Sequence, residues 1–218
     1  MEILFVRHGE SEANLLELMY GSSDYHLTNK GVKQAKSAGK IIELMGFIPD
    51  EIYVSTLTRA QETLENMGFK LNGAQKDERI NERHLGTLEG INYHELNKNQ
   101  PEIFTDWNND WLDYKPGGGE SHLDFESRII SFLKDLEEKH QNGERVLVVS
   151  HGGTMKTIFS YIFKSNPEHY FNIEIHNCSI MRITKSGKRY TFDALYNIHD
   201  FEELTVLDTV ENDETAKN

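Results

Sequence analysis

Two short stretches with the same plan decide the fold: LFVRHG at residues 4–9 and VVSHGG at residues 148–153. Each is an apolar run that ends in His-Gly, and a helical pattern follows it. A nearly continuous apolar run is typical of a strand buried on both faces of a parallel sheet. Because the carboxyl ends of parallel strands meet at one edge of a sheet, we expect His8 and His151 to lie at the same edge.

A third strand adds an arginine to this edge. Residues 51–54 (EIYV) have a strand pattern, and Arg59 follows about one helical turn into the next helix. Arg7 stands directly before His8. Glycine after each histidine lets backbone and ligand approach closely, and helix N-termini favour an anion. The sequence therefore predicts a cationic pocket made of Arg7, His8, Arg59 and His151.

The rest of the chain alternates between strands and helices, which predicts an α/β fold: a three-layer α/β/α sandwich with a mostly parallel central sheet. Helical spacing and caps predict helices over 13–19, 28–45, 121–140 and 154–163, with a further helix beginning at 57. Buried or alternating apolar patterns predict strands over 2–6, 51–54, 145–149, 178–183 and 189–197, the last two joined by a hairpin turn at 186–187.

Residues 91–119 interrupt this alternation. They are rich in aromatic residues and contain a Lys-Pro-Gly-Gly-Gly run, but they show little periodicity. We interpret them as a small helical cap insertion. Either the cap arches over one end of the sheet and its aromatic residues line a pocket, or it is a helical subdomain whose aromatic residues form its own core. We expect one domain over 1–207 and an acidic, frayed tail over 208–218.

The composition excludes several classes of protein. The chain of 218 residues has 23 Lys and Arg against 36 Asp and Glu, a formal net charge of −13 at pH 7. Such a surplus repels nucleic acid and acidic membrane surfaces, so we expect neither as a partner. We read no membrane span and no signal peptide. Cys178 is the single cysteine, which favours a cytoplasmic protein, and we expect it to be a buried, inert thiol.

A cationic pocket in an acidic protein suits phosphoryl transfer, since its catalysis is mostly positioning and electrostatic stabilisation of charge spread over three oxygens. Guanidinium groups match phosphate oxygens bidentately. A neutral imidazole can attack phosphorus and hold the group as a phosphohistidine. A carboxylic acid must then protonate the leaving alkoxide and later activate water.

Six segments, in this order, resemble the histidine phosphatase superfamily, which includes cofactor-dependent phosphoglycerate mutases and broad-specificity phosphatases. An Arg-His-Gly motif alone is a moderate signal, but six matched segments in order are not expected by chance. They cover most of the chain: VRHGESEAN (6–14), LTNKGVKQA (27–35), STLTRAQET (55–63), NERHLGTLEG (81–90), GGES (118–121) and VSHGG (149–153).

The resemblance implies the catalytic roles. His8 would be the phosphorylated nucleophile, and Arg7, Arg59 and a protonated His151 would clamp the phosphoryl group. Glu82 would be the general acid and base, a role that rests on the family motif because spacing alone does not single out one acid among 36. The resemblance implies no metal and no cofactor, and the sequence has no HExxH motif.

The resemblance also implies substrate contacts. Asn14 and the backbone of Gly152 would add hydrogen bonds to the phosphoryl group. Tyr20 and Gly21 occupy the loop that contacts substrate, although the family often has another residue where Tyr20 stands. We expect Arg83 to form a structural ion pair with a neighbouring carboxylate, and the eight histidines outside the pocket to have no catalytic role.

The sequence leaves three functions to compare. Mutases of this superfamily carry an additional basic segment after the acid motif, but here no arginine occurs from 84 to 127, and Lys98 and Lys115 are the only cations of fixed charge there. This scarcity favours a phosphatase for small phosphorylated metabolites, with a phosphoglycerate mutase as the alternative. A non-catalytic phospho-ligand binder is the alternative of another class, although His8 and Glu82 are both present. The sequence predicts no oligomeric state.

Overall fold

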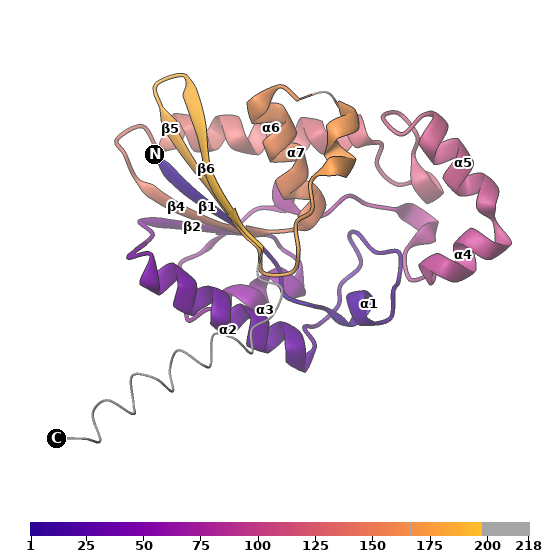
Figure 1. The fold of residues 1–218 in the computed structure, drawn as a ribbon, viewed down its shortest axis with the longest axis horizontal. Coiled ribbons are helices and arrows are strands. Elements are labelled where there is room, and N and C mark those ends of the chain that lie inside the picture. Colours follow the sequence, from indigo (N-terminus) through magenta and orange to yellow (C-terminus); the bar gives the residue numbers. More distant parts are fainter. Residues whose placement is uncertain (166, 198–218) are drawn as a thin grey trace.

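The computed structural model describes residues 1–165 and 167–197, and it contains a six-stranded sheet (Figure 1). The strand order is β3-β2-β4-β1-β5-β6. Strands β3, β2, β4 and β1 are mutually parallel, while β5 runs antiparallel to β1 and β6 antiparallel to β5. The strands are β1 (Glu2–Arg7), β2 (Glu51–Val54), β3 (Gln75–Lys76), β4 (Arg145–Ser150), β5 (Ile180–Ser186) and β6 (Arg189–Tyr196).

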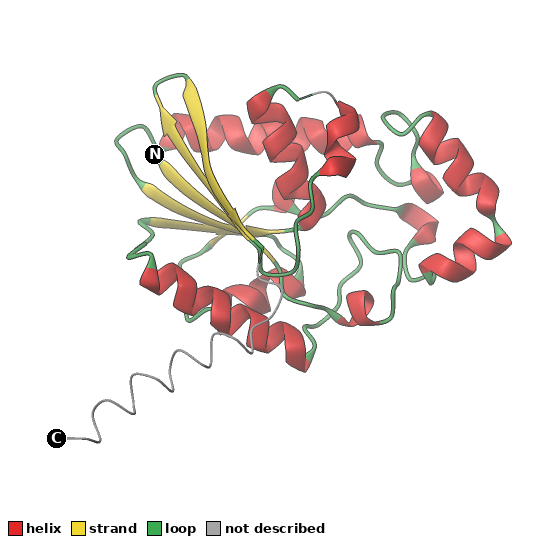
Figure 2. Ribbon diagram, viewed as in Figure 1, coloured by secondary structure: helices red, strands yellow, loops and turns green. Residues whose placement is uncertain are grey.

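Helices cover both faces of the sheet, as Figures 1 and 2 show. Helices α2 (Asn29–Leu44) and α3 (Thr58–Asn66) pack on one face, and α6 (His122–Lys139) and α7 (Gly152–Phe163) pack on the other. A hydrophobic core lies on each face of the sheet, and alternate residues of β1 belong to one or the other. Leu4 and Val6 pack with α2 and α3, while Ile3 and Phe5 pack with α6 and α7. The expected three-layer sandwich with a mostly parallel sheet is confirmed.

Local sequence signals place the long helices well. Thr28 caps α2, its side chain accepting a hydrogen bond from the Gly31 amide, and Ser121 and Asp124 form a reciprocal capping box at the start of α6. The helix expected over 13–19 is wrong in its extent, because α1 covers only Glu12–Leu15. Glu17 has a φ of 52°, a left-handed conformation that no helix can continue through.

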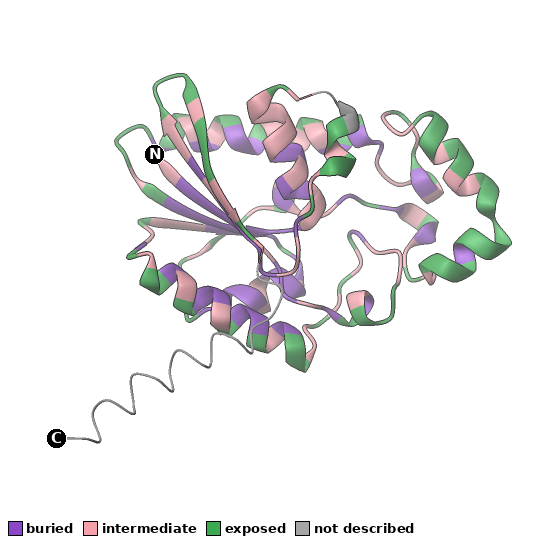
Figure 3. Cartoon of the chain, in the orientation of Figure 1, coloured by how far each residue is buried: buried purple, intermediate pink, exposed green. Residues whose placement is uncertain are grey.

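The insertion at 91–119 folds as two short helices, α4 (Tyr93–Asn99) and α5 (Pro101–Asn109), which extend to one side of the sheet (Figure 1). Their surfaces are largely exposed (Figure 3). Leu85, Leu88 and Leu96 form a small core with Phe104 and Trp107 packed against it, which favours the interpretation as a subdomain. Trp111 instead packs against His122, Tyr170 and Phe171, outside this core.

Short 3₁₀ helices complete the chain at Glu78–Ile80, Gly86–Leu88, Pro116–Gly118 and Pro167–Asn172. Across the described residues, no helix is both long and apolar enough to cross a membrane. The tail expected over 208–218 lies outside the described residues, and the single domain over 1–207 stays a prediction.

Candidate active site

The register of the two central strands brings the histidines together. β1 and β4 are parallel neighbours in which Arg7 pairs with Ser150, so the next residue of each strand, His8 and His151, enters the site side by side. Their ring centroids are 5.2 Å apart and both side chains are buried. The sequence argument for a shared edge therefore gives the right arrangement.

His8 has the protonation state of a nucleophile. Its Nδ1 lies 2.7 Å from the Gly9 carbonyl oxygen and must donate to it, which leaves the lone pair on Nε2. Burial, together with the positive charges of Arg59 and Arg7, lowers the pKa of His8 well below its ordinary value. The ring is therefore neutral near pH 7.

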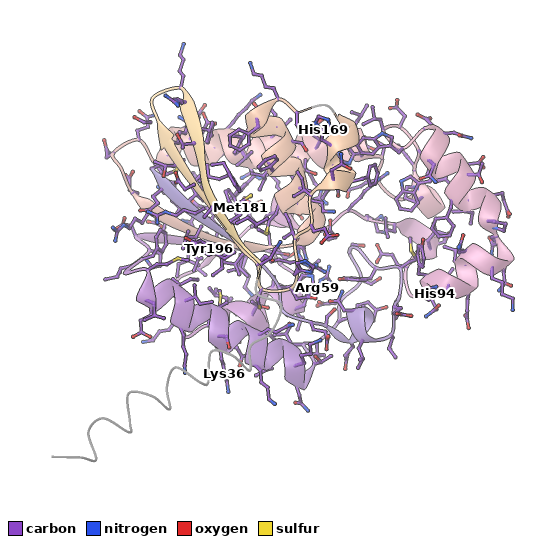
Figure 4. All side chains as sticks on the ribbon, viewed as in Figure 1. Lys36, Arg59, His94, His169, Met181 and Tyr196 are labelled. Atoms are coloured by element: carbon purple, nitrogen blue, oxygen red, sulfur yellow. The ribbon has the colours of Figure 1, made fainter. Side chains whose placement is uncertain are left out.

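The two arginines enter from different elements and are held by backbone carbonyls. Arg59, in the first turn of α3, is fully buried and donates to the carbonyls of Ser23 (2.9 Å) and Gly21 (2.6 Å). Arg7 donates to the Ile175 carbonyl at 2.7 Å. The Nε atoms of both arginines are buried without a hydrogen-bond partner in the described part of the chain. Figure 4 shows Arg59 near the point where the strands converge.

Helix α1 supplies Asn14, and the loop after it supplies Tyr20 and Gly21. The Asn14 amide donates to the Tyr20 hydroxyl at 2.5 Å, and the Arg59 guanidinium lies over the Tyr20 ring, 5.0 Å from its centroid. Gly21 orients Arg59 through its carbonyl, as described above. A side chain cannot replace its hydrogen, since a Cβ at Gly21 would lie 1.8 Å from the Arg83 carbonyl oxygen. The loop thus forms one wall of the cationic pocket.

The structure also brings Glu82 to the start of α7. Its carboxylate accepts hydrogen bonds from the amides of Gly153 (2.9 Å) and Arg83 (3.0 Å). Gly152 is the first residue of α7, directly after His151, and a Cβ built on it would lie 3.3 Å from Arg7 Nε. The first amides of a helix have no intrahelical acceptor, so this helix end can bind an anion between the two histidines and the acid.

The electrostatics of His151 depend on whether an anion is bound. Without one, burial and the charges of Arg59, His8, Arg7 and Arg128 lower its pKa well below the ordinary value, so the protonated state expected with a phosphoryl group stays a prediction. The ring is therefore neutral, because each added positive charge in this neighbourhood costs energy until an anion compensates it.

Arg83 differs from the expectation. Its guanidinium donates to the backbone carbonyls of Glu120 (3.0 Å) and Tyr114 (2.8 Å) and lies over the Trp107 ring. It therefore ties the cap to the acid motif instead of pairing with a carboxylate. Carbonyl oxygens of a folded loop carry no signal that a sequence pattern can reveal.

Two histidines of the described residues, His94 and His84, lie on the surface outside the pocket. The exposed His94 on α4 contacts Glu17 and is far from Arg59 in Figure 4, and His84 is half-exposed beside Glu89. Cys178 is buried, and burial raises the pKa of its thiol to about 12. Within residues 1–165 and 167–197, no group of three or more His, Cys, Asp or Glu is arranged to hold a metal ion.

Sequence reasoning missed several residues that support the histidines. The Asn177 amide donates to the His8 carbonyl at 3.1 Å, and the Gly9 amide donates to Thr63. Ser55 lies 2.7 Å from His151 and also contacts Asn81. Ser55 directly follows β2, at the edge where the pocket was expected, so its position was a usable signal. The position of Asn177 in a loop gives none.

Comparison with known proteins agrees with this geometry. The family model described as the histidine phosphatase superfamily (branch 1) matches residues 3–198. A 2,3-bisphosphoglycerate-dependent phosphoglycerate mutase from Bradyrhizobium diazoefficiens is 34% identical over 180 residues, covering 79% of this chain and 86% of the relative.

Solved structures give the same family. A protein described as an alpha-ribazole-5′-P phosphatase from Escherichia coli superposes with a TM-score of 0.82 and 27% identity, over 90% of this chain and 96% of the other. A phosphoserine phosphatase mutant from Entamoeba histolytica, in complex with phosphoserine, superposes with a TM-score of 0.76 and 26% identity, over 89% and 95% of the two chains. The chain belongs to the histidine phosphatase superfamily, branch 1.

Proposed function

We propose that this protein is a metal-independent phosphatase that hydrolyses small phosphorylated metabolites through a phosphohistidine on His8. The observation that carries the proposal is a neutral, buried imidazole with its Nε2 lone pair free, flanked by two fixed guanidinium groups. That combination provides a nucleophile and the charge needed to bind a phosphoryl dianion in one place.

The chemistry follows from the positions of these groups. Nε2 of His8 attacks phosphorus, and the bond from phosphorus to the leaving oxygen breaks. Arg7, Arg59 and His151 bind the equatorial oxygens while their negative charge redistributes. Glu82, on the amides at the start of α7, gives a proton to the leaving alkoxide. The same carboxylate then takes a proton from the water that attacks the phosphohistidine, and phosphate leaves.

The charges in and beside the cap favour a phosphatase over a phosphoglycerate mutase. A mutase must hold a second phosphate and a carboxylate, which needs further cations. Lys115 in the cap is paired with Asp124 at 2.7 Å, and Arg83 in the acid motif donates to backbone carbonyls. Lys98 lies in the last turn of the exposed helix α4. These cations are already bound to other groups or lie on the exposed helix α4. The pocket therefore has enough positive charge for one phosphoryl group but too little for a bisphosphate.

Phosphoglycerate mutase is the second candidate, because relatives at 34–35% identity carry that description. The two are separated by incubation with 3-phosphoglycerate and a trace of 2,3-bisphosphoglycerate. A phosphatase releases inorganic phosphate, whereas a mutase forms 2-phosphoglycerate with little free phosphate. The second result would reverse the preference. We also propose a cytoplasmic location, on the single buried thiol and the acidic composition.

A phosphoenzyme trap tests the mechanism and separates it from mere ligand binding. With 4-nitrophenyl phosphate the leaving group needs no acid, so Glu82→Gln is phosphorylated but hydrolysed slowly. We expect a burst of nitrophenolate and an acid-labile phosphoenzyme in Glu82→Gln, and neither in His8→Ala. The exposed His94→Ala variant is the matched control and should turn over normally. Full turnover by His8→Ala would show that the nucleophile is another residue, and the absence of phosphoenzyme in every variant would favour a pure binder.

A further inference from the structure

A hydrogen-bonded chain of two polar side chains stands behind His151. Nε2 of this buried ring lies 2.7 Å from the Ser55 hydroxyl oxygen. The same hydroxyl lies 2.7 Å from the Asn81 side-chain oxygen. Ser55 is also fully buried, so the hydrogen bonds that join His151, Ser55 and Asn81 lie in the interior of the site and are shielded from competing water.

The directions of these hydrogen bonds are fixed by a backbone group. The Thr56 amide donates to the same Asn81 atom at 2.9 Å, and a backbone amide can only donate, so that atom is the carbonyl oxygen of Asn81. The Ser55 hydroxyl must therefore donate its single O–H to the carbonyl oxygen of Asn81. The Leu57 amide occupies one Ser55 acceptor site at 3.2 Å. His151 meets the remaining lone pair and must donate to it from Nε2.

The consequence is a defined tautomer. A neutral imidazole carries one proton, and here that proton is on Nε2. The other ring nitrogen, Nδ1, is buried and has no hydrogen-bond partner among the described residues. Nδ1 therefore has an unprotonated lone pair, while the N–H at Nε2 donates to Ser55. A lone pair repels a phosphoryl oxygen, so this neutral ring cannot donate to the anion.

The charges around the ring set when it can take a second proton. Arg59 on α3, His8 and Arg7 at the end of β1, and Arg128 on α6 all lower the pKa of His151, in addition to burial. Glu82 brings a carboxylate to this end of α7, where it accepts from the amide of Gly153, two residues beyond the ring. A dianion placed between the arginines reverses this balance, because it offsets their charge and accepts a hydrogen bond from Nδ1–H.

We propose that a dianionic oxyanion binds at this site together with one proton, which is taken up on Nδ1 of His151, and that Ser55 and Asn81 enforce the uptake by holding the Nε2–H tautomer. This rests on the phosphoryl pocket proposed above. The proton comes from solvent, or from the substrate when a phosphate monoester arrives as its monoanion. Ser55 and Asn81 are positioning residues, since they act on the anion only through His151.

Tungstate is a suitable probe, because it is a tetrahedral dianion that carries no proton of its own near neutral pH. Calorimetric titration at about pH 7.5 in two buffers of different ionisation enthalpy gives the number of protons taken up per ion. We expect about one proton for the parent protein, less than about half in Ser55→Ala and Asn81→Ala, and about one in Ser55→Thr, which keeps the hydroxyl. Without the Ser55–Asn81 constraint, the neutral ring can carry its proton on Nδ1 and needs no second one.

The outcomes separate this inference from the proposed function. Failure of the parent protein to bind tungstate would overturn the phosphoryl pocket and this inference with it. Binding without proton uptake would overturn the inference alone. Unchanged uptake in Ser55→Ala would place the proton on another group, such as His8, and would also overturn it. If Ser55→Ala fails to fold, Asn81→Ala compared with Ser55→Thr gives the same decision.

Discussion

A methyl group added at Gly153 should displace the general acid while leaving the nucleophile in place. An alanine Cβ there would lie 2.3 Å from Glu82 Oε1 and 3.0 Å from the Tyr170 hydroxyl, whereas ordinary contact begins at 3.4 Å. The carboxylate must therefore move by about 1 Å, and a misplacement of that size costs on the order of 100-fold, or about 2.7 kcal/mol of transition-state stabilisation. The atoms nearest to that Cβ belong to Glu82 and Tyr170, so the clash falls on the acid rather than on the nucleophile.

The assay compares kcat/KM for two leaving groups. For an alkyl phosphate, which needs a proton on its leaving oxygen, we expect Gly153→Ala to lose about 100-fold. For 4-nitrophenyl phosphate, whose leaving group departs as an anion, we expect a loss below about 5-fold. Gly187→Ala controls for a general loss of stability, because a Cβ there meets nothing within 4 Å while its φ of 57° strains the backbone away from Glu82. Equal losses on both substrates would refute the assignment of Glu82 as the acid, and so would no loss on either.

Three further predictions concern charge and protonation. Burial lowers the pKa of His8, His151 and His122, the last to about 4, so below pH 6.5 the unfolded chain binds more protons than the folded one. As the pH is lowered, the free energy of unfolding should therefore decrease by about 1.4 kcal/mol per pH unit for each ring that is still neutral in the folded protein. Urea titrations between pH 6.5 and 4 should give a smaller dependence on pH in His122→Gln. An unchanged slope would contradict the neutral buried His122. Arg59→Lys loses the guanidinium that donates to two carbonyls and should lower kcat/KM by at least about 100-fold. Arg79→Lys, at a surface ion pair with Asp135, should keep its activity. Comparable activity in both variants would argue against the role of Arg59 in binding the phosphoryl group. Activity should survive excess chelator, and a loss restored by a divalent cation would contradict the metal-independent mechanism.

The sequence predicts the central layers well because their signals are local. The apolar run before each His-Gly pair, the Thr28 cap and the Ser121–Asp124 box are each contained within a few residues, and the structure has these elements close to the expected bounds. The pocket follows from the same logic, because the ends of neighbouring parallel strands must meet.

The errors arise where long-range contacts decide the outcome. Met19 and Ile91 are joined by a backbone hydrogen bond, and Leu18 bridges to Asn92, so the segment expected to continue as a helix pairs with a distant loop. The lowered pKa of His151 has a related origin: the cations that lower it come from three separate elements. Arg7, His8 and Arg59 were expected beside His151, but Arg128 was not, and the sequence pattern alone does not give their combined effect on a buried ring.

The placement of β1 has a consequence for how the protein is made. This apolar strand leaves the ribosome well before both of its partners, since β4 begins at Arg145 and β5 at Ile180. At a synthesis rate of roughly 5–20 residues per second, β1 waits on the order of 10 s or more for its first neighbour. During that time both of its edges are unpaired, so the strand that delivers the nucleophile is also a segment of the nascent chain exposed to aggregation.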